Sequence, residues 1–451
     1  MSYSPDTIAA LATPAGTSAL AVVRTSGPAA AALALAIFRE TPPPRLARHA
    51  DYRDVRDQLV DDVLFTFFAA PNSFTGEDSL EISCHGNPFI AQKILEDLLA
   101  RGCRPAGPGE FSQRAFLNGR MDLSQAEAVM DLIHARSERA LAAANQQLRG
   151  ALGRRMETLS TQLIGLLAQI EAYIDFPEED LPAEDRPALR AQLAGLLAGT
   201  AQLLATSHYG ELLRAGIRTV IVGEPNAGKS SLLNRLVGAE RALVSPEPGT
   251  TRDYIEERVA LGAHWLRLID TAGLNDQPSA LERRGIDKTL EQAAQADLFL
   301  WVIDATRPAP DLPPALRPRM TPANTIAVYN KSDLPPAVMR SPLPASFPRV
   351  NVSALNGAGL ETLQAAIFDL AESARVEIGS ELIAINARHA NALIQAKSSL
   401  ESGLSKLDLG EASELIASDL RDTLDAFGQI AGKIDNEKIL DQLFANFCIG
   451  K

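Results

Sequence analysis

Cysteine is scarce in this chain. It occurs three times in 451 residues, as Cys84, Cys103 and Cys448. An odd number of widely spaced cysteines, with no C-x-x-C pair, excludes a disulfide framework and a typical zinc site, and it suits a reducing cytosol. Cys448 stands in the terminal stretch FCIGK, where no later residue can bury it, which raises the question of a chemical role.

Positive charge is also in deficit. Lys and Arg total 43 against 56 Asp and Glu, which gives a net charge of −13 at pH 7. A uniformly acidic surface repels nucleic acid, so any contact with RNA must be local or supplied by a partner protein.

Long uninterrupted apolar runs are missing from the beginning of the chain. The first residues carry no basic region before an apolar run, so we expect no secretory signal. The most apolar stretch there, residues 19–38, is interrupted by Arg24, Gly27 and Pro28. It predicts a strand, a turn and a helix rather than a membrane span, and we expect a cytoplasmic protein without membrane contact.

The composition nevertheless supports substantial cores, because hydrophobic residues make up 46% and charged residues 22%. At this length two or three domains are expected. Residues 1–122 mix short β-rich runs with helical stretches, which predicts an α+β domain. The pattern turns helical from residue 123. Apolar residues spaced by three and four predict one face of a single long helix, and they are Leu148, Leu152, Met156, Leu159, Leu163, Leu167, Ile170 and Ile174.

The pattern changes again between residues 217 and 373, where strands alternate with helices. Such alternation predicts a parallel sheet flanked by helices. Residues 374–451 are helical again, like residues 123–216. The sequence therefore predicts an α/β domain inserted into an all-helical domain, with the α+β domain in front.

The stretch GEPNAGKS, residues 223–230, fits the phosphate-loop pattern G-x-x-x-x-G-K-[ST]. It follows a predicted strand and opens a predicted helix, as this motif requires. Its glycines allow backbone N–H groups to wrap the phosphates, Lys229 reaches the terminal phosphates, and the Ser230 hydroxyl ligates Mg²⁺.

Two further motifs follow, each at the end of a predicted strand. In DTAG, residues 270–273, Asp270 can hold Mg²⁺ through water and the Gly273 amide can sense the γ-phosphate. In NKSD, residues 330–333, the Asp333 carboxylate can accept hydrogen bonds from guanine N1–H and the 2-amino group. Adenine offers neither donor, so ATP would leave this carboxylate unpaired at a cost of about 1–3 kcal/mol.

The stretch SAL, residues 353–355, would complete the base pocket, and GTTRD, residues 249–253, lies where the first switch is expected. Thr251 is positioned there for Mg²⁺. Together these motifs predict a Ras-like GTPase domain that binds GTP and Mg²⁺. The residues expected at the nucleotide are Asn226, Ala227, Gly228, Lys229, Ser230, Ser231, Ser245, Thr250, Thr251, Asp270, Thr271, Ala272, Gly273, Asn330, Lys331, Asp333, Ser353, Ala354 and Leu355.

One catalytic group of Ras-like enzymes is missing. They place a glutamine just after D-x-x-G to orient the attacking water, whereas this chain has Leu274. No arginine is obviously placed as a finger in cis, so charge on the leaving phosphate must be neutralised in another way. Asn226 is a candidate ligand for a monovalent cation at that place, or simply a turn-stabilising residue.

With these residues in hand, the chain resembles the tRNA-modifying GTPase family MnmE, also called TrmE. Besides the GTPase motifs, the resemblance rests on GEDSLEISCHGN, PGEFSQRAFLNGRMDLSQAEA, IDFPEED and the terminal FCIGK. It implies a homodimer that acts on the wobble uridine of tRNA with the FAD-dependent partner MnmG (GidA), in a heterotetramer. It further implies a one-carbon tetrahydrofolate donor, 5,10-methylene- or 5-formyl-tetrahydrofolate, and GTP hydrolysis by paired G domains in the presence of K⁺. The uridine would receive an aminomethyl-type group at C5, such as carboxymethylaminomethyl.

By position, the resemblance assigns K⁺ binding to Asn226, Ser245, Glu247 and Thr250. Pro248 follows Glu247 and favours extended backbone there, which differs from the more usual family sequence. The resemblance assigns orientation of the attacking water to Glu282, which on its own reads as a solvated charge at a helix start.

The resemblance also assigns folate binding to Arg24, Glu81 and Arg120. A carboxylate can pair with the pterin's N3–H and 2-amino group, and a cation suits the glutamate tail of folate. Each of these residues taken alone reads as a salt bridge. The tail would fold back toward this site and bring the Cys448 sulfur and the Lys451 carboxylate to the one-carbon unit, where a thiolate could act as nucleophile or redox partner.

Two other functions stay open on the sequence. A K⁺-dependent GTPase switch in ribosome assembly would share the G domain but would need neither a folate pocket nor a terminal cysteine. A structural dimeric scaffold would not need a complete Mg²⁺ and guanine site.

Overall fold

The computed structural model describes residues 6–40, 43–175, 185–239, 256–261, 264–270, 296–308, 310–311, 316–335, 346–373, 382–432, 444, 447–448 and 450. The chain divides into two units, one formed by residues 1–130 with 428–451 and the other by residues 131–427. Each unit is described by itself.

The first unit contains a mixed sheet with strand order β3-β4-β5-β2-β1-β6 in its described residues. All neighbours pair antiparallel except β1 and β6. The strands are β1 (Ile8–Leu11), β2 (Leu20–Ser26), β3 (Ala47–Arg53), β4 (Leu59–Phe68), β5 (Ser79–His85) and β6 (Arg104–Pro105). The expected strand and helix of residues 19–38 are confirmed as β2 and α1 (Ala30–Phe38), whereas β1, β3 and β6 were not anticipated.

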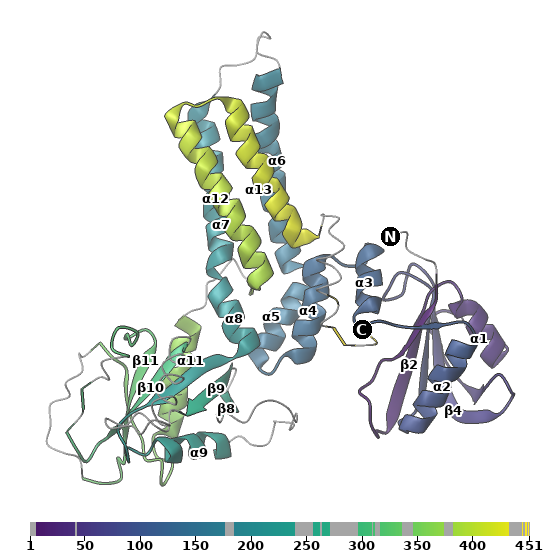
Figure 1. Cartoon of the computed structure of the whole chain (residues 1–451), viewed down its shortest axis with the longest axis horizontal. Helices are drawn as coiled ribbons and strands as arrows, with labels where there is room; N and C mark the ends of the chain where they lie inside the picture. Colours follow the sequence, from purple (N-terminus) through teal and green to yellow (C-terminus); the bar gives the residue numbers. More distant parts are fainter. Residues whose placement is uncertain are drawn as a thin grey trace, which may run out of the picture. The chain divides into compact units, whose positions relative to one another are not determined.

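The helices α1 and α2 (Pro88–Ala100) share one apolar core with this sheet (Figure 1). α2 begins where the Asn87 side chain accepts a hydrogen bond from the Phe89 N–H and Pro88 occupies the first turn. Ala91, Ile94 and Leu98 follow at helical spacing and are buried against the strands. The N-terminal cap and the apolar stripe therefore both favour a helix that starts at Pro88 and packs on the sheet.

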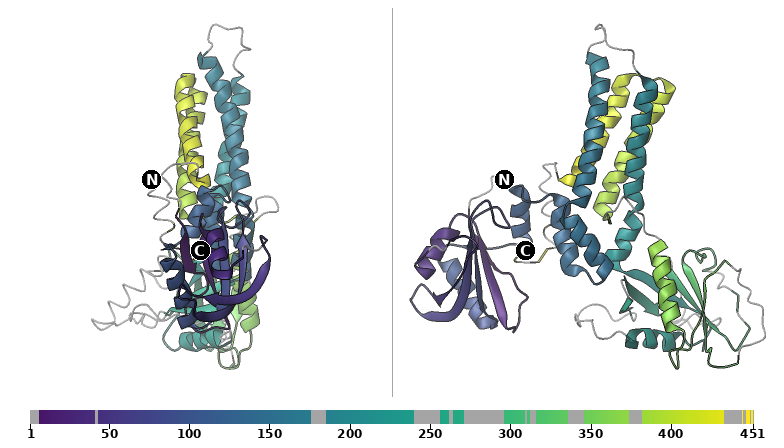
Figure 2. Two further views of the ribbon diagram at one scale, coloured as in Figure 1. Left: turned by 90° about the vertical axis from the view of Figure 1, so that its right-hand side faces the viewer. Right: turned by 180° about the vertical axis from the view of Figure 1, so that it is seen from behind.

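The second unit contains a set of long helices, and α6, α7, α12 and α13 run side by side in both views of Figure 2. The helices are α4 (Leu123–His134, which begins in the first unit), α5 (Glu138–Leu148), α6 (Ala151–Asp175), α7 (Arg186–Ala205), α8 (Ser207–Ala215), α12 (Ala387–Leu409) and α13 (Ser413–Ala431). The expectation of one long helix that includes Leu148 is wrong. Gly150 adopts a φ of 81°, which ends the α-helical path after α5, so Leu148 belongs to α5 and the long helix starts at Ala151.

Between α8 and α12 lies a second sheet, with strand order β12-β11-β10-β7-β9-β8 in its described residues. Its strands are β7 (Ile217–Val222), β8 (Glu256–Leu261), β9 (His264–Asp270), β10 (Leu298–Asp304), β11 (Thr325–Asn330) and β12 (Arg349–Asn351). The expected parallel pairing is found throughout except at β8, an edge strand antiparallel to β9. Every residue of β10 is buried, as is typical of a central strand covered on both faces.

The helices α9 (Lys229–Ala239) and α11 (Leu360–Ser373) belong to this α/β part. α11 packs on the sheet through Leu363, Ile367 and Ala371, which are spaced by four. The predicted combination of α+β, all-helical and inserted α/β parts is thus confirmed. The three boundaries between the predicted segments remain predictions. No helix in the described part of the chain is long and apolar enough to cross a bilayer.

Candidate functional site: a phosphate loop and an arginine–glutamate ion pair

The loop after β7 has the backbone that phosphate binding needs. Gly223, Asn226 and Gly228 adopt positive φ angles of 155°, 64° and 93°. A Cβ atom on Gly223 would lie 2.2 Å from the Val302 carbonyl oxygen, and one on Gly228 would lie 2.2 Å from Asn330 Nδ2. Only glycine fits at these two places, so the spacing of the motif is a steric requirement.

Lys229, the first residue of α9, folds its side chain back over the loop. Its ammonium donates hydrogen bonds to the Gly223 and Glu224 carbonyl oxygens, both at 2.9 Å. The cation therefore lies over the same turn whose amides and helix N-terminus favour an anion. This arrangement suits the phosphates of a nucleotide.

Asn330, the last residue of β11, joins three of the predicted segments. Its Nδ2 donates to the Ala227 carbonyl oxygen at 2.9 Å, and its Oδ1 accepts from the Ala354 N–H at 3.0 Å. Ala227 and Ala354 are buried, whereas Asp333 and Leu355 are exposed. The phosphate loop, NKSD and SAL thus meet through a single buried side chain, with the Asp333 carboxylate open to a ligand.

Asp304, at the end of β10, was not anticipated. It pairs in register with Asn330, and its Oδ2 lies 2.6 Å from the Lys331 ammonium. Its Oδ1 accepts from the Thr306 N–H and hydroxyl. Burial opposes ionisation, but the hydrogen bonds from Lys331 and Thr306 prevail and lower the pKa of Asp304 to about 2. The signal available in the sequence was an acidic residue at the end of the apolar run LFLWVI, residues 298–303.

A second candidate site lies on the mixed sheet. Arg24 on β2 and Glu81 on β5 are direct cross-strand partners, and their side chains form an ion pair at 2.7 Å. The guanidinium carbon of Arg24 lies 5.8 Å from the Phe74 ring centre and 5.7 Å from that of Phe111. A half-buried ion pair flanked by aromatic rings can bind a flat ligand that carries both donors and acceptors.

The C-terminal tail reaches this pair. Arg24 Nη1 donates to the Gly450 carbonyl oxygen at 3.4 Å, and the Gly109 N–H donates to the Cys448 carbonyl oxygen at 3.3 Å. Phe444 and Phe447 are buried against Leu123 and Ala126, which anchors the tail, while Cys448 is exposed and reduced. The structure thus brings Arg24, Glu81 and the tail together. Arg120 is exposed beside Gly76, and no contact among the described residues joins it to Arg24 or Glu81.

Comparison with known sequences agrees with this geometry. A family model described as the MnmE helical domain matches residues 123–448, and one described as the N-terminus of the GTP-binding protein TrmE matches residues 7–120. A protein of Opitutus terrae named tRNA modification GTPase MnmE is 59% identical over 447 residues, covering 99% of each chain.

This chain belongs to the MnmE family of tRNA modification GTPases. A second MnmE relative, from Akkermansia muciniphila, is 44% identical over 450 residues and covers 99% of each chain. Among solved structures, the G domain of the T. maritima FeoB iron transporter is 27% identical and covers 34% of this chain and 98% of that one, with a TM-score of 0.26.

Several residues assigned from the GTPase motifs or from the MnmE resemblance lie outside the described residues, namely Ser245, Glu247, Thr250, Thr251, Thr271, Ala272, Gly273, Glu282 and Lys451. Ser230 and Ser231 are exposed in the first turn of α9. The Ser230 hydroxyl is therefore accessible to a metal ion. The backbone of Asp270 ends β9 directly beside β7, opposite Ile221. Asn226 is exposed, which leaves its amide accessible to a cation.

One carboxylate, that of Glu372, links the α/β part of this MnmE chain to two of the helices. Glu372, in the last turn of α11, accepts hydrogen bonds from Tyr209 of α8 at 3.0 Å and from the ring of His264 at 2.8 Å, and it pairs with Arg139 of α5 at 3.1 Å. Burial lowers the pKa of His264, so its ring is neutral at pH 7. Burial opposes ionisation of Glu372, but the hydrogen bonds from His264 and Tyr209 hold its pKa below the usual value.

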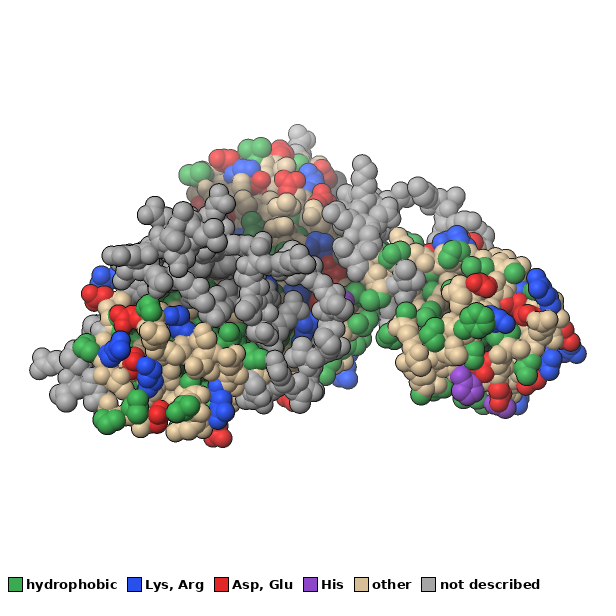
Figure 3. Space-filling view, turned by 60° about the horizontal axis from the view of Figure 1, so that its bottom comes forward, with side chains coloured by type: hydrophobic (Ala, Val, Ile, Leu, Met, Phe, Trp, Pro, Cys, Tyr) green, Lys and Arg blue, Asp and Glu red, His purple; other side chains and the backbone are tan. Residues whose placement is uncertain are grey.

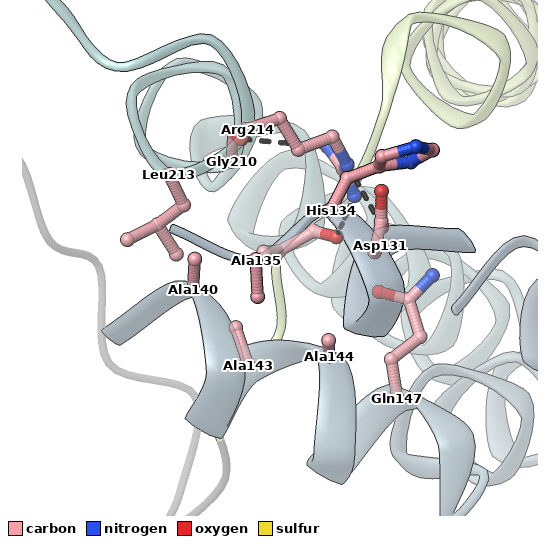
Figure 4. A pocket seen from close by; sticks show the side chains of 11 residues that line it. Asp131, His134, Ala135, Ala140, Ala143, Ala144, Gln147, Gly210, Leu213 and Arg214 are labelled. Atoms are coloured by element: carbon pink, nitrogen blue, oxygen red, sulfur yellow. Dashed lines mark hydrogen bonds and ion pairs between the residues drawn. The ribbon is translucent and has the colours of Figure 1, made fainter. Parts of the chain in front are cut away.

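A small cavity of about 50 Å³ lies next to this contact (Figure 4). Ala140, Ala143 and Ala144 form its apolar side, and Arg214 closes another side by an ion pair with Asp131 at 2.9 Å. Arg214 also donates to the carbonyl oxygens of Ala384 and Ile385, both at 2.8 Å. One guanidinium therefore joins α8, which leads into β7, to the segment that leads into α12.

Charged side chains of both signs alternate over one face of the molecule. On the face drawn in Figure 3, the described Lys and Arg side chains stand among Asp and Glu side chains rather than in a continuous patch. Two arginines near the start of α5 are engaged within the protein, since Arg139 pairs with Glu372 and Arg136 lies 5.4 Å from the Trp265 ring centre.

Proposed function

We propose that this MnmE-family GTPase couples GTP hydrolysis to modification of the wobble uridine of tRNA at C5, with addition of an aminomethyl-type group such as carboxymethylaminomethyl. The observation that carries the proposal is the Asn330 junction, which holds the phosphate loop, NKSD and SAL in one site. Such a preformed guanine site supports a nucleotide-driven enzyme over a scaffold.

In this proposal Lys229 and the amides of residues 223–230 hold the phosphates, Asp333 accepts from guanine, and Ser230 with Thr251 holds Mg²⁺. The metal supplies positive charge against the phosphate oxygens. The Lys229 ammonium is already positioned at the loop, within hydrogen-bonding distance of two of its carbonyl oxygens. Glu282 orients the attacking water, because Leu274 has no group that can do so.

Asn226, Ser245, Glu247 and Thr250 would hold K⁺ when two G domains of a homodimer pair. The bound ion would supply the positive charge that an arginine finger supplies in other GTPases. The accessible amide of Asn226 supports this assignment, since an oxygen ligand suits a hard cation. GTP turnover should be several-fold faster in KCl than in NaCl at equal ionic strength and should rise with protein concentration. Equal rates in the two salts would remove Asn226 from the mechanism.

The one-carbon donor, 5,10-methylene- or 5-formyl-tetrahydrofolate, binds at Arg24, Glu81 and Arg120 in this proposal, with the Lys451 carboxylate nearby. The tail contact between Arg24 and Gly450 supports a role of Cys448 at the same site. Cys448 acts there as nucleophile or redox partner, together with the FAD-dependent partner MnmG in a cytoplasmic heterotetramer.

Nucleoside mass spectrometry tests this function directly. Cells whose only copy carries Cys448→Ser should lose the C5 substituent at the wobble uridine, while the purified variant retains GTP turnover. A K⁺-dependent switch in ribosome assembly predicts unchanged tRNA nucleosides and altered ribosome profiles instead. Normal modification in the variant would contradict the assignment of Cys448.

A further inference from the structure

The turn after β11 holds Lys331 in an uncommon conformation. Lys331 has a φ of 63°, in the left-handed region that residues other than glycine seldom adopt. The Ala305 N–H donates to the Asn330 carbonyl oxygen at 2.9 Å, and the Ser332 N–H donates to the Val352 carbonyl oxygen at 3.0 Å. Strained residues of this kind persist where the surroundings over-determine them, and they cluster at functional sites.

The other end of Lys331 is fixed as well. Its ammonium lies 2.6 Å from Asp304 Oδ2, and the side chain of Asp304 is only 8% exposed. Asp304 cannot easily turn away, because its Oδ1 accepts from the Thr306 N–H at 3.0 Å and from the Thr306 hydroxyl at 2.6 Å. Both ends of the lysine are therefore held, and its methylene stem extends between them.

Lys331 is close in the chain and in the sheet to the residues expected at the base. Asp304 ends β10 in register with Asn330, and Asp333 lies two residues beyond Lys331. A methylene stem held flat offers an apolar surface that suits the face of a purine. Lysine is among the side chains that lose most rotamer freedom on ordering, so fixing it in advance improves binding of whatever packs on it.

We propose that Asp304 is a positioning residue for guanine-nucleotide binding, which acts by holding Lys331 extended beneath the base. This inference rests on the proposed GTP-binding function. It assigns Asp304 to the base and not to the phosphates. The affinities for GDP and for GTP should therefore depend on Asp304 equally.

The test is a double-mutant cycle in the full chain, with GDP affinity measured by calorimetry. Asp304→Asn keeps the shape of the side chain and removes its charge, and Lys331→Met keeps the stem and removes the ammonium. Each single variant should weaken GDP and GTP binding about tenfold, while kcat at saturating GTP stays within twofold. The double variant should bind no more weakly than Lys331→Met alone, because Asp304 acts through Lys331.

The matched control is Asp369→Asn, which removes the same charge from an exposed position of α11 and should change GDP affinity less than twofold. The ratio of GDP to IDP affinity should be unchanged in Asp304→Asn, because Asp333 and not Asp304 reads the 2-amino group. A multiplicative loss in the double variant, or unchanged affinity in Asp304→Asn, would overturn the proposal. Absence of GDP binding in the unaltered chain would instead contradict the proposed function.

Discussion

The two candidate sites are assembled over very different lengths of chain. The nucleotide site consists of short segments that each follow a strand of the parallel sheet, and those strands end at one edge. The site on the mixed sheet pairs Arg24 with Glu81, 57 residues away, and with Gly450, 426 residues away. The first is a set of local motifs placed by strand order, and the second exists only once distant parts of the chain have packed.

This difference predicts different failures. Changes in the nucleotide site should act through the chemistry of single side chains. Changes in the Arg24 site, formed by Arg24, Glu81 and the tail at Gly450, should act through docking of the tail as much as through the residue that is altered.

The largest effect is expected for Lys229→Ala. Loss of the ammonium from the phosphate loop removes a preorganised charge and should lower kcat/KM for GTP by about 10²–10³. Phosphate release measured in KCl tests this, with Lys397→Ala as the control. Lys397 carries the same charge in an exposed pair with Glu401 on α12 and should leave turnover unchanged. A loss of less than fivefold in Lys229→Ala would show that the loop does not bind the phosphates.

The next largest effect is expected for Asp333→Asn. Guanine then meets an amide donor where it needs an acceptor, so GTP affinity should fall about 10- to 100-fold. Xanthine carries an oxygen in place of the 2-amino group, so affinity for XTP should rise. Competition between the two nucleotides measures the crossover, and an equal loss for both would argue for misfolding of the loop.

A smaller effect is expected for Arg24→Ala on binding of 5-formyl-tetrahydrofolate to the full chain, measured by calorimetry. Loss of the ion pair with Glu81 and of the contact with Gly450 should weaken binding about tenfold. Arg48→Ala, on the exposed face of β3, is the control and should have no effect.

A chain that ends at Phe447 sharpens the comparison. It should lose folate affinity and keep GTP turnover, because the tail contacts only the first unit in the described residues. Loss of folate affinity together with loss of GTP turnover would show that the two sites are not independent.

The smallest effect concerns the contact of the α/β part with the helices. Burial places the pKa of His264 below its usual 6.5, so this side chain binds a proton more readily in the unfolded state than in the folded state. The contribution to stability is complete above about pH 6.5 and is lost as the pH falls through the folded-state pKa. Glu372 titrates below its usual 4.5 and does not contribute in this window.

Urea unfolding at pH 7.5 and 5.5 measures this dependence. The unaltered chain should lose more stability than His264→Gln across that interval, because only the unaltered chain must place a proton on a buried imidazole. Equal losses in the two proteins would show that His264 is not held neutral.

The segments of the candidate nucleotide site could be recognised in the sequence because its motifs are local and their geometry is steric. Gly223 and Gly228 have no room for a side chain, and Asn330 must reach both the loop and Ala354. Asp304 escaped notice because its partner Lys331 is 27 residues away, and only strand pairing brings the two together.

The Arg24 site could be named only through family resemblance. Nothing local in the sequence shows that Arg24 and Glu81 are cross-strand partners or that Gly450 reaches them. The long-helix prediction failed for a related reason, since apolar spacing continues across Gly150 although the backbone turns there. Periodicity reports which side chains are buried, not whether the helix carrying them is continuous.

The insertion of the α/β part also governs the order in which the protein can fold during synthesis. α7 buries Leu189, Leu193, Leu196 and Leu203 and packs against α12, yet about 180 residues separate the end of α7 from the start of α12. At usual rates of translation, roughly 10–40 s pass between the two helices. During that time the leucine face of α7 is not yet covered by α12, while the inserted domain can already complete its own core.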